Sequence, residues 1–155
     1  MRALRDRAWW YLVAFAGLIV VFGLGDVLVG AVADPGIALG LTGLTLPELE
    51  AQSAAAYRMF DFTTRTQGWN LAVVGALLLA SLLIPYRAGK RWAWWVLWLL
   101  PAWSLGVAGL YLLIGLAPGQ PPPPPLISGP VLGSIAAAVL LLDRRRFLGA
   151  GSGTR

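Results

Sequence analysis

The chain of 155 residues contains no cysteine and no histidine. Without cysteine it forms no disulfide and offers no thiolate to a metal or a substrate. Without histidine it lacks the usual imidazole ligand of zinc and haem, and the side chain that most often exchanges protons near neutral pH. We therefore expect no cofactor and no catalysis that depends on a thiol or an imidazole.

Charge is also scarce, because charged residues make up 12% of the chain and hydrophobic residues 58%. The mean hydropathy of +0.72 reflects long apolar blocks, which a soluble domain does not have. The net charge of +5 comes from short basic clusters beside these blocks, where lipid headgroups explain it. We expect an integral membrane protein whose first partner is the lipid bilayer, with no nucleic-acid partner.

Four apolar runs divide the chain, at about residues 8–33, 68–84, 92–116 and 128–142. A membrane-crossing helix needs about 20 apolar residues, so each run predicts one span. We predict an all-α fold, an up-down bundle of four transmembrane helices over residues 1–146, with a flexible cytoplasmic tail at 147–155. Proline is expected to end the second span at Pro85 and to kink the third at Pro101.

The first run could also be interpreted as a signal peptide. Three arginines precede it, and Ala31, Val32 and Ala33 form an A-x-A pattern before Asp34. The apolar stretch is longer than the core of a typical signal peptide, so we predict a retained first helix.

The longest polar stretch lies between the first two runs. Thr45 and Glu48 form a capping box with Pro47 in the first turn, which predicts an amphipathic helix over about 46–61 at the outer membrane surface. The glycines and proline before Thr45 limit any preceding helix to about one turn. Between the last two runs, the five prolines at 121–125 predict an extended polyproline II loop, and the last span is expected to open near Ser128.

Basic residues give the orientation. Three precede the first span, three lie in the turn at 87–91 and four follow the last span, whereas the other two connections contain only Arg58 and Arg65. Positive residues stay in the cytoplasm, so both termini are expected there. Eleven arginines against one lysine are typical of a GC-rich prokaryotic genome, which places the protein in a bacterial inner membrane.

Asp26 is the only acidic residue inside a predicted span, and a carboxylate in the bilayer needs a partner or water. Arg65 and Asn70 are expected at a similar depth in the second helix. We predict an outward-facing polar cluster of Asp26, Arg65 and Asn70, joined by Asp61 and Gln67. Two interpretations stay open: a ligand or proton site, or a buried clamp between the first two spans.

The eight tryptophans also have two interpretations. Most of them are explained as anchors at the membrane interface. Trp69, Trp98 and Trp103 are candidates to line a site for a lipid, a quinone or another flat apolar molecule. Glycines inside the spans are expected to permit close helix contacts; they include Gly17, Gly23, Gly25, Gly75, Gly106, Gly109 and Gly133.

The plan of four spans and the basic, aromatic turn from Arg87 to Trp95 resemble the small uncharacterised bacterial membrane proteins grouped around the DoxX family. The resemblance covers the span plan and this turn. It implies no catalytic residues. Because some DoxX relatives are associated with redox partners, it implies an accessory role.

No phosphate loop, catalytic serine motif or carboxylate-rich metal cluster is present in the sequence. This absence favours a non-catalytic accessory or scaffold subunit of a larger membrane complex, with membrane-protein partners or self-association. The alternative is a protein that binds or transports a small ligand, a lipid or a quinone between spans 1 and 2. An enzyme that uses Asp26 as acid or base is least favoured, because no second carboxylate in a span accompanies it.

Overall fold

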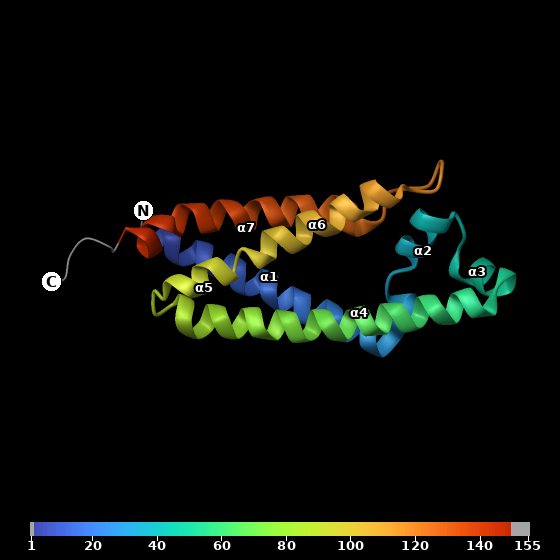
Figure 1. Cartoon of the computed structure of the whole chain (residues 1–155), viewed down its shortest axis with the longest axis horizontal. Coiled ribbons are helices and arrows are strands. Elements are labelled where there is room, and N and C mark those ends of the chain that lie inside the picture. Colours follow the sequence, from blue (N-terminus) through green and yellow to red (C-terminus); the bar gives the residue numbers. More distant parts are fainter. Residues whose placement is uncertain (1, 150–155) are drawn as a thin grey trace.

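The computed structural model describes the backbone of residues 2–149 and the side chains of residues 9–149. This part of the chain contains helices and no strand. The elements are α1 (Arg2–Val29), the 3₁₀ helix η1 (Gly30–Ala33), α2 (Pro35–Thr42), α3 (Leu46–Gln52), α4 (Ala54–Ser81), the π-helical turn η2 (Leu82–Tyr86), α5 (Arg91–Val96), α6 (Leu99–Ile114) and α7 (Pro124–Leu148) (Figure 1).

Four helical segments are long and apolar enough to cross a membrane. They are Trp9–Ala33, Ala54–Tyr86, Arg91–Ile114 and Pro124–Leu148. The prediction of an all-helical chain with four apolar spans is therefore confirmed. The second and fourth helices extend well beyond the predicted spans at 68–84 and 128–142. Of the predicted tail at 147–155, the first two residues belong to α7, and residues 150–155 lie outside the described residues.

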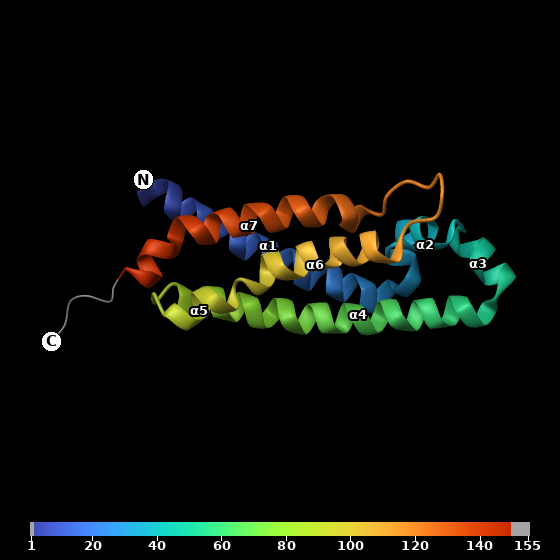
Figure 2. The same ribbon diagram turned by 45° about the horizontal axis from the view of Figure 1, so that its top comes forward.

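The long helices form two hairpins, because α1 packs along α4 and α6 packs along α7 (Figures 1 and 2). Glycines permit the close approach in each hairpin. A Cβ added to Gly23 would lie 2.6 Å from the carbonyl oxygen of Gly68 on α4, and one added to Gly129 would lie 2.7 Å from the carbonyl oxygen of Ser104 on α6. Residues with larger side chains would force the helices apart at these points.

The hydrophobic core lies at the end of the bundle that holds α5, η2 and the last turns of α7. There the Tyr11 hydroxyl donates to the Leu132 carbonyl at 3.0 Å, which joins the two hairpins, and Trp94 Nε1 donates to the Leu140 carbonyl at 2.9 Å, which joins α5 to α7. The largest fully buried side chains of this core are Tyr86, Leu12, Leu82, Leu97, Leu100 and Leu140. Toward the other end, the buried apolar residues are mostly alanines, namely Ala31, Ala38, Ala72 and Ala108.

Pro101 interrupts the third span as predicted, although the break lies one turn earlier. Helix α5 ends at Val96 and α6 begins at Leu99. Pro101 has no N–H for the carbonyl of Leu97, four residues before it, and this carbonyl accepts from the N–H of Leu100 at 3.1 Å instead. At Pro85 the helix does not end as expected, because the proline fits within the wider π-helical turn η2.

The helices between the first two spans differ from the prediction. The capping box of Thr45 and Glu48 is confirmed as the start of α3, but the predicted helix over 46–61 is divided at Ser53. The backbone of Ser53 is extended, and its hydroxyl accepts a 3.2 Å hydrogen bond from the N–H of Ala56. The side chain therefore caps α4, and residues 54–61 belong to the second long helix. Helix α2 has 8 residues, more than the single turn expected.

The proline loop packs against α2. Pro123 is fully buried, and its Cδ would lie 2.9 Å from a Cβ added to Gly40. The N–H of Ala117 donates to the carbonyl of Gly40 at 2.8 Å. Pro123 is extended, with φ −61° and ψ 148°, but α7 begins at Pro124 instead of Ser128. Prolines are accepted in the first turn of a helix because its N–H groups have no partner inside the helix.

Candidate functional site

A cavity of about 380 Å³ lies between the two hairpins and borders the hydrophobic core at Phe15 and Ile19. Side chains from α1, α4, α6 and α7 form its wall. The lining is mostly apolar and aromatic, and includes Phe15, Phe22, Leu71, Trp103, Val107 and Leu132. Asp26, Asp34 and Tyr111 lie at the end of the cavity near α2. This first cavity is therefore apolar along its length and acidic at one end.

Asp26 is 9% exposed and belongs to the wall of the first cavity. Within the part of the chain that the structure describes, its carboxylate makes no hydrogen bond or ion pair. Gly68 permits this position, because a Cβ there would lie 2.5 Å from the Cβ of Asp26. A buried carboxylate without a partner is energetically costly and accepts a cation, a proton or a hydrogen-bond donor readily.

Asp34 supplies the second carboxylate of the first cavity. It occupies the N-cap position of α2, but its side chain makes no capping hydrogen bond to that helix. Burial raises the pKa of Asp34 above its ordinary value, because the charged form loses water. No group of three or more acidic residues that could hold a metal ion occurs among residues 2–149.

Arg65 and Asp61 form a separate clamp, which we call the Arg65 clamp. Arg65 Nε donates to Asp61 Oδ2 at 2.9 Å, and its Nη1 donates to the carbonyls of Val27 at 2.7 Å and Leu28 at 3.2 Å. The N–H of Ala31 donates to Asp61 Oδ1 at 2.9 Å. These bonds satisfy carbonyls at the end of α1, where a helix has no partners of its own. The clamp fixes the end of α1 against α4.

The structure thus divides the predicted polar cluster. Arg65 and Asp61 are together in the clamp, and Asp26 lines the first cavity. Asn70 lines a second cavity of about 360 Å³ between α4 and α6. The two cavities share four wall residues, Ile19, Gln67, Leu71 and Trp103.

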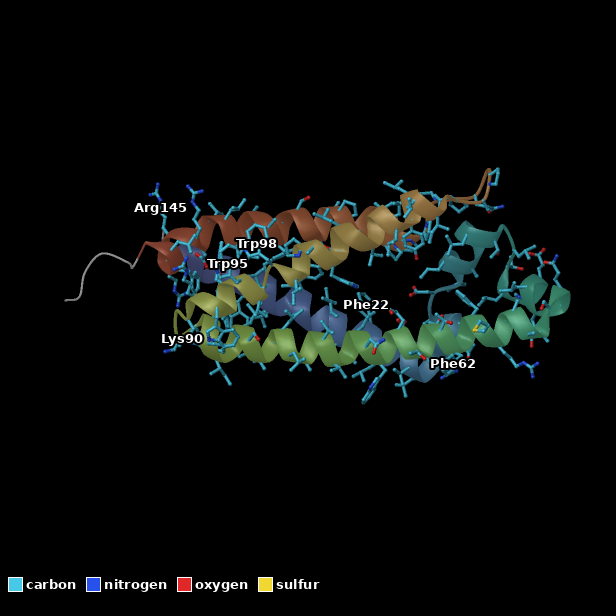
Figure 3. The ribbon with its side chains drawn as sticks, in the orientation of Figure 1. Phe22, Phe62, Lys90, Trp95, Trp98 and Arg145 are labelled. Carbon is cyan, nitrogen blue, oxygen red and sulfur yellow. The ribbon has the colours of Figure 1, made fainter. Side chains whose placement is uncertain are left out.

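The three candidate tryptophans also lie in three different environments. Trp103 lines both cavities and is 38% exposed. Trp98, labelled in Figure 3, lines neither cavity and packs against the core. Its ring centroid lies 5.7 Å from that of Trp94. Trp69 lines neither cavity and is 59% exposed, as expected for a side chain in contact with lipid.

Sequence reasoning missed several residues of this region. Asp34 and Tyr111 line the first cavity, and Ser104 and Ser128 lie along it. Asp34 was assigned to the loop after the first span, and no periodicity marks which face of an apolar helix meets a neighbour. Asp143 was also missed as a buried acid, because it directly precedes three arginines and the predicted span ends at residue 142.

Exposed basic side chains gather at the opposite end of the molecule, where Lys90 and Arg145 are labelled in Figure 3. Arg146 Nη2 donates to the carbonyl of Arg87 at 2.5 Å, and Arg87 lies over the ring of Trp9, 5.2 Å from its centroid. The acidic cavity and the basic surface therefore lie at opposite ends of the bundle.

No protein-family model, no curated protein and no solved structure matches this chain.

Proposed function

We propose that this membrane protein binds a small amphipathic amine in the first cavity, with the ammonium group at Asp26 and the apolar body between the hairpins. The observation that carries this proposal is the buried carboxylate of Asp26 in the wall of a cavity, which has no hydrogen-bond or ion-pair partner among the described residues. An ammonium ion is the partner that such a carboxylate lacks. Asp34 at the same end favours a positive group over an anionic one.

The shape of the cavity supports a molecule of modest size. Its volume of about 380 Å³ falls within the range of small-molecule sites, roughly 300–1,000 Å³. Such sites are lined mainly by apolar and aromatic side chains with a few polar groups that orient the ligand. Phe22 and Trp103 supply flat apolar walls of this kind, and Asp26 supplies the orienting charge.

In the membrane, we propose an up-down bundle with both termini in the cytoplasm of a bacterium and α3 at the outer surface. The basic side chains at the end of the bundle that holds the α4–α5 turn support this orientation. The first cavity then lies in the outer half of the bilayer. Its ligand is bound from the outer leaflet or the outer solution, which fits the binding step of a receptor or a transporter.

The accessory-subunit interpretation stays a prediction, as does a DoxX-like role. Exposed apolar side chains cover α1, α4, α6 and α7, and lipid contact requires such faces in any protein with several spans. They give no separate support to a protein partner. The cavity favours ligand binding, so ligand binding comes first.

The test compares benzylamine with benzyl alcohol, which has a similar shape and no charge. Binding is measured by calorimetry on the protein in phosphatidylcholine nanodiscs. We expect Asp26→Asn to weaken benzylamine binding at least tenfold, because a charge-assisted hydrogen bond contributes about 1.5–3 kcal/mol. Benzyl alcohol binding should stay within about twofold.

Glu50→Gln is the matched control, since Glu50 is an exposed acid on α3 that lines neither cavity. The proposal fails if the native protein does not bind benzylamine, or if Asp26→Asn binds it as well as the native protein does.

A further inference from the structure

The second cavity adjoins the first along a shared wall. Ile19, Leu71 and Trp103 stand between the two cavities, and Gln67 borders both. Gln67 directly precedes Gly68, the residue against which Asp26 packs. A molecule held at Asp26 is therefore separated from the second cavity only by this shared wall, which includes Trp103.

The lining of the second cavity changes along α4. Its polar residues, Gln67 and Asn70, lie toward the outer end of the helix. One and two turns further, Val74 and Leu78 face Leu99 and Leu100 of α6, so this part is apolar. A groove that is polar at one end and apolar beyond fits a hydrocarbon chain whose polar end lies near Gln67.

The second cavity is also open at the side of the bundle. Val74 and Leu99 belong to its wall and are both exposed. They lie within the membrane-crossing segments, so this side faces lipid. An alkyl chain can enter between α4 and α6 without leaving the apolar phase.

Trp103 has fewer specific contacts than Trp94, the tryptophan of the hydrophobic core. Trp94 donates a hydrogen bond to the Leu140 carbonyl and stacks edge-on with Trp95 and Trp98. Among the described side chains, Trp103 makes no hydrogen bond and no aromatic contact. Its ring can therefore move between the two cavities at a lower cost than that of Trp94.

We propose that the second cavity is the tail subsite of the same ligand, which makes the ligand a long single-chain alkyl amine. The ammonium group is bound at Asp26, the chain passes Trp103, and its end lies between α4 and α6. This inference rests on the proposed function and names the ligand class that the two adjoining cavities fit.

The test fills the second cavity and leaves the first unchanged. Val74→Trp places a large ring in the second cavity, whereas Val73→Trp adds the same ring to a neighbour that lines neither cavity; the two valines are 44% and 42% exposed. Dodecylamine and benzylamine are the probes, at one fixed lipid concentration, so that partition into the bilayer is the same for every variant.

We expect Val74→Trp to weaken dodecylamine binding at least fivefold and Val73→Trp to change it less than twofold. Neither variant should change benzylamine binding. Equal dodecylamine binding by both variants, with benzylamine still dependent on Asp26, overturns the tail subsite and leaves the proposed function standing. Failure of the native protein to bind benzylamine overturns both.

A second measurement does not depend on the folding of Val74→Trp. 11-Bromoundecylamine carries a bromine that quenches nearby tryptophan fluorescence, and the part of the quenching that dodecylamine reverses reports the bound chain. Trp103→Phe should remove most of this reversible part, whereas Trp69→Phe should retain it. If Trp103→Phe retains it, the chain does not pass Trp103, and the inference is wrong.

Discussion

The hydroxyl of Tyr86 donates a 2.6 Å hydrogen bond to Oδ2 of Asp143, which follows it by 57 positions. Both side chains are buried, and Asp143 is only 3% exposed. The ring of Phe147 packs 4.7 Å from that of Tyr86, and Arg146 lies over both rings. The pair joins η2 to α7 at the end of the bundle that holds the hydrophobic core. It therefore contributes to holding the two hairpins together there.

Tyr86→Phe is expected to lower the free energy of unfolding by about 1–3 kcal/mol, because a buried carboxylate loses a hydrogen-bond donor. Tyr111→Phe is the matched control, since the Tyr111 hydroxyl makes no hydrogen bond in the described part of the chain. Reversible unfolding in mixed micelles, followed by circular dichroism, measures both. Equal stability of the two variants would contradict a role for the Tyr86 bond.

The close contact of α1 with α4 predicts different effects for two neighbouring glycines. A Cβ at Gly23 would lie 2.5 Å from the backbone nitrogen of Ala72, whereas one at Gly25 would meet nothing within 4 Å. Gly23→Ala should destabilise the protein by about 1–3 kcal/mol through overpacking. Gly25→Ala should leave stability unchanged or raise it by up to about 1 kcal/mol, because alanine favours the helix. The same unfolding assay in mixed micelles measures the free energy of unfolding of both variants. If Gly23→Ala does not lower it, α1 and α4 do not approach each other this closely.

The Arg65 clamp predicts that lysine cannot replace arginine at this position. The guanidinium bonds Asp61 and the carbonyls at the end of α1 at the same time, and a single ammonium group lacks this fork of donors. Arg65→Lys should cost about 1–3 kcal/mol of stability and speed hydrogen exchange in η1. Arg58→Lys, at an exposed arginine without an ion pair in the described chain, should change neither. If hydrogen exchange in η1 is as slow in Arg65→Lys as in the native protein, the Arg65 clamp is refuted.

The capping box of α3 predicts a pH dependence outside the membrane. The hydroxyl and the N–H of Thr45 both donate to Glu48 Oε2, at 2.7 and 2.8 Å, and hold the pKa of Glu48 below its ordinary value. The unfolded-state pKa is about 4.3. The contribution of the cap is therefore complete above that pH, and is lost as the pH falls through the lower pKa of the folded state.

Thr45→Val should raise the pKa of Glu48 toward its ordinary value, which a carboxyl-detected NMR titration measures. Glu50 serves as the internal reference, because it lies on the same short helix and has no bond to Thr45. An unchanged Glu48 titration in Thr45→Val would show that the box does not form in the micelle.

For the fold, hydropathy was sufficient to predict the four spans, because a bilayer requires long apolar helices and leaves few alternatives. Local rules also predicted the start of α3 and the break that Pro101 causes. They failed at Ser53, where a polar residue that fits a helix surface caps a new helix. They failed again at the prolines, since Pro124 begins α7 and the extended part of the loop is fixed by packing on Gly40.

For the site, the sequence singled out Asp26, Asn70 and Trp103 as candidates, and all three line a cavity, but it grouped Asp26 with Arg65. Depth along a helix follows from residue number, whereas the direction in which a side chain points depends on how that helix is rotated against its neighbours. Spans that are apolar on every face do not encode this rotation in their pattern. Trp69 and Trp103 illustrate the point, because the same residue type faces lipid on α4 and lines both cavities on α6.

The amino-acid sequence by itself determined the helical class, the number of apolar spans and the asymmetry of basic charge, because each follows from residue type and spacing along one chain. Only the tertiary structure decided that Arg65 caps α1, that Tyr86 meets Asp143 and that Asp26 lies beside a cavity with no partner in the described part of the chain. These relationships join residues tens of positions apart, and they depend on glycine contacts that set how closely the helices approach. Such contacts are a property of two packed surfaces, which no single stretch of sequence contains.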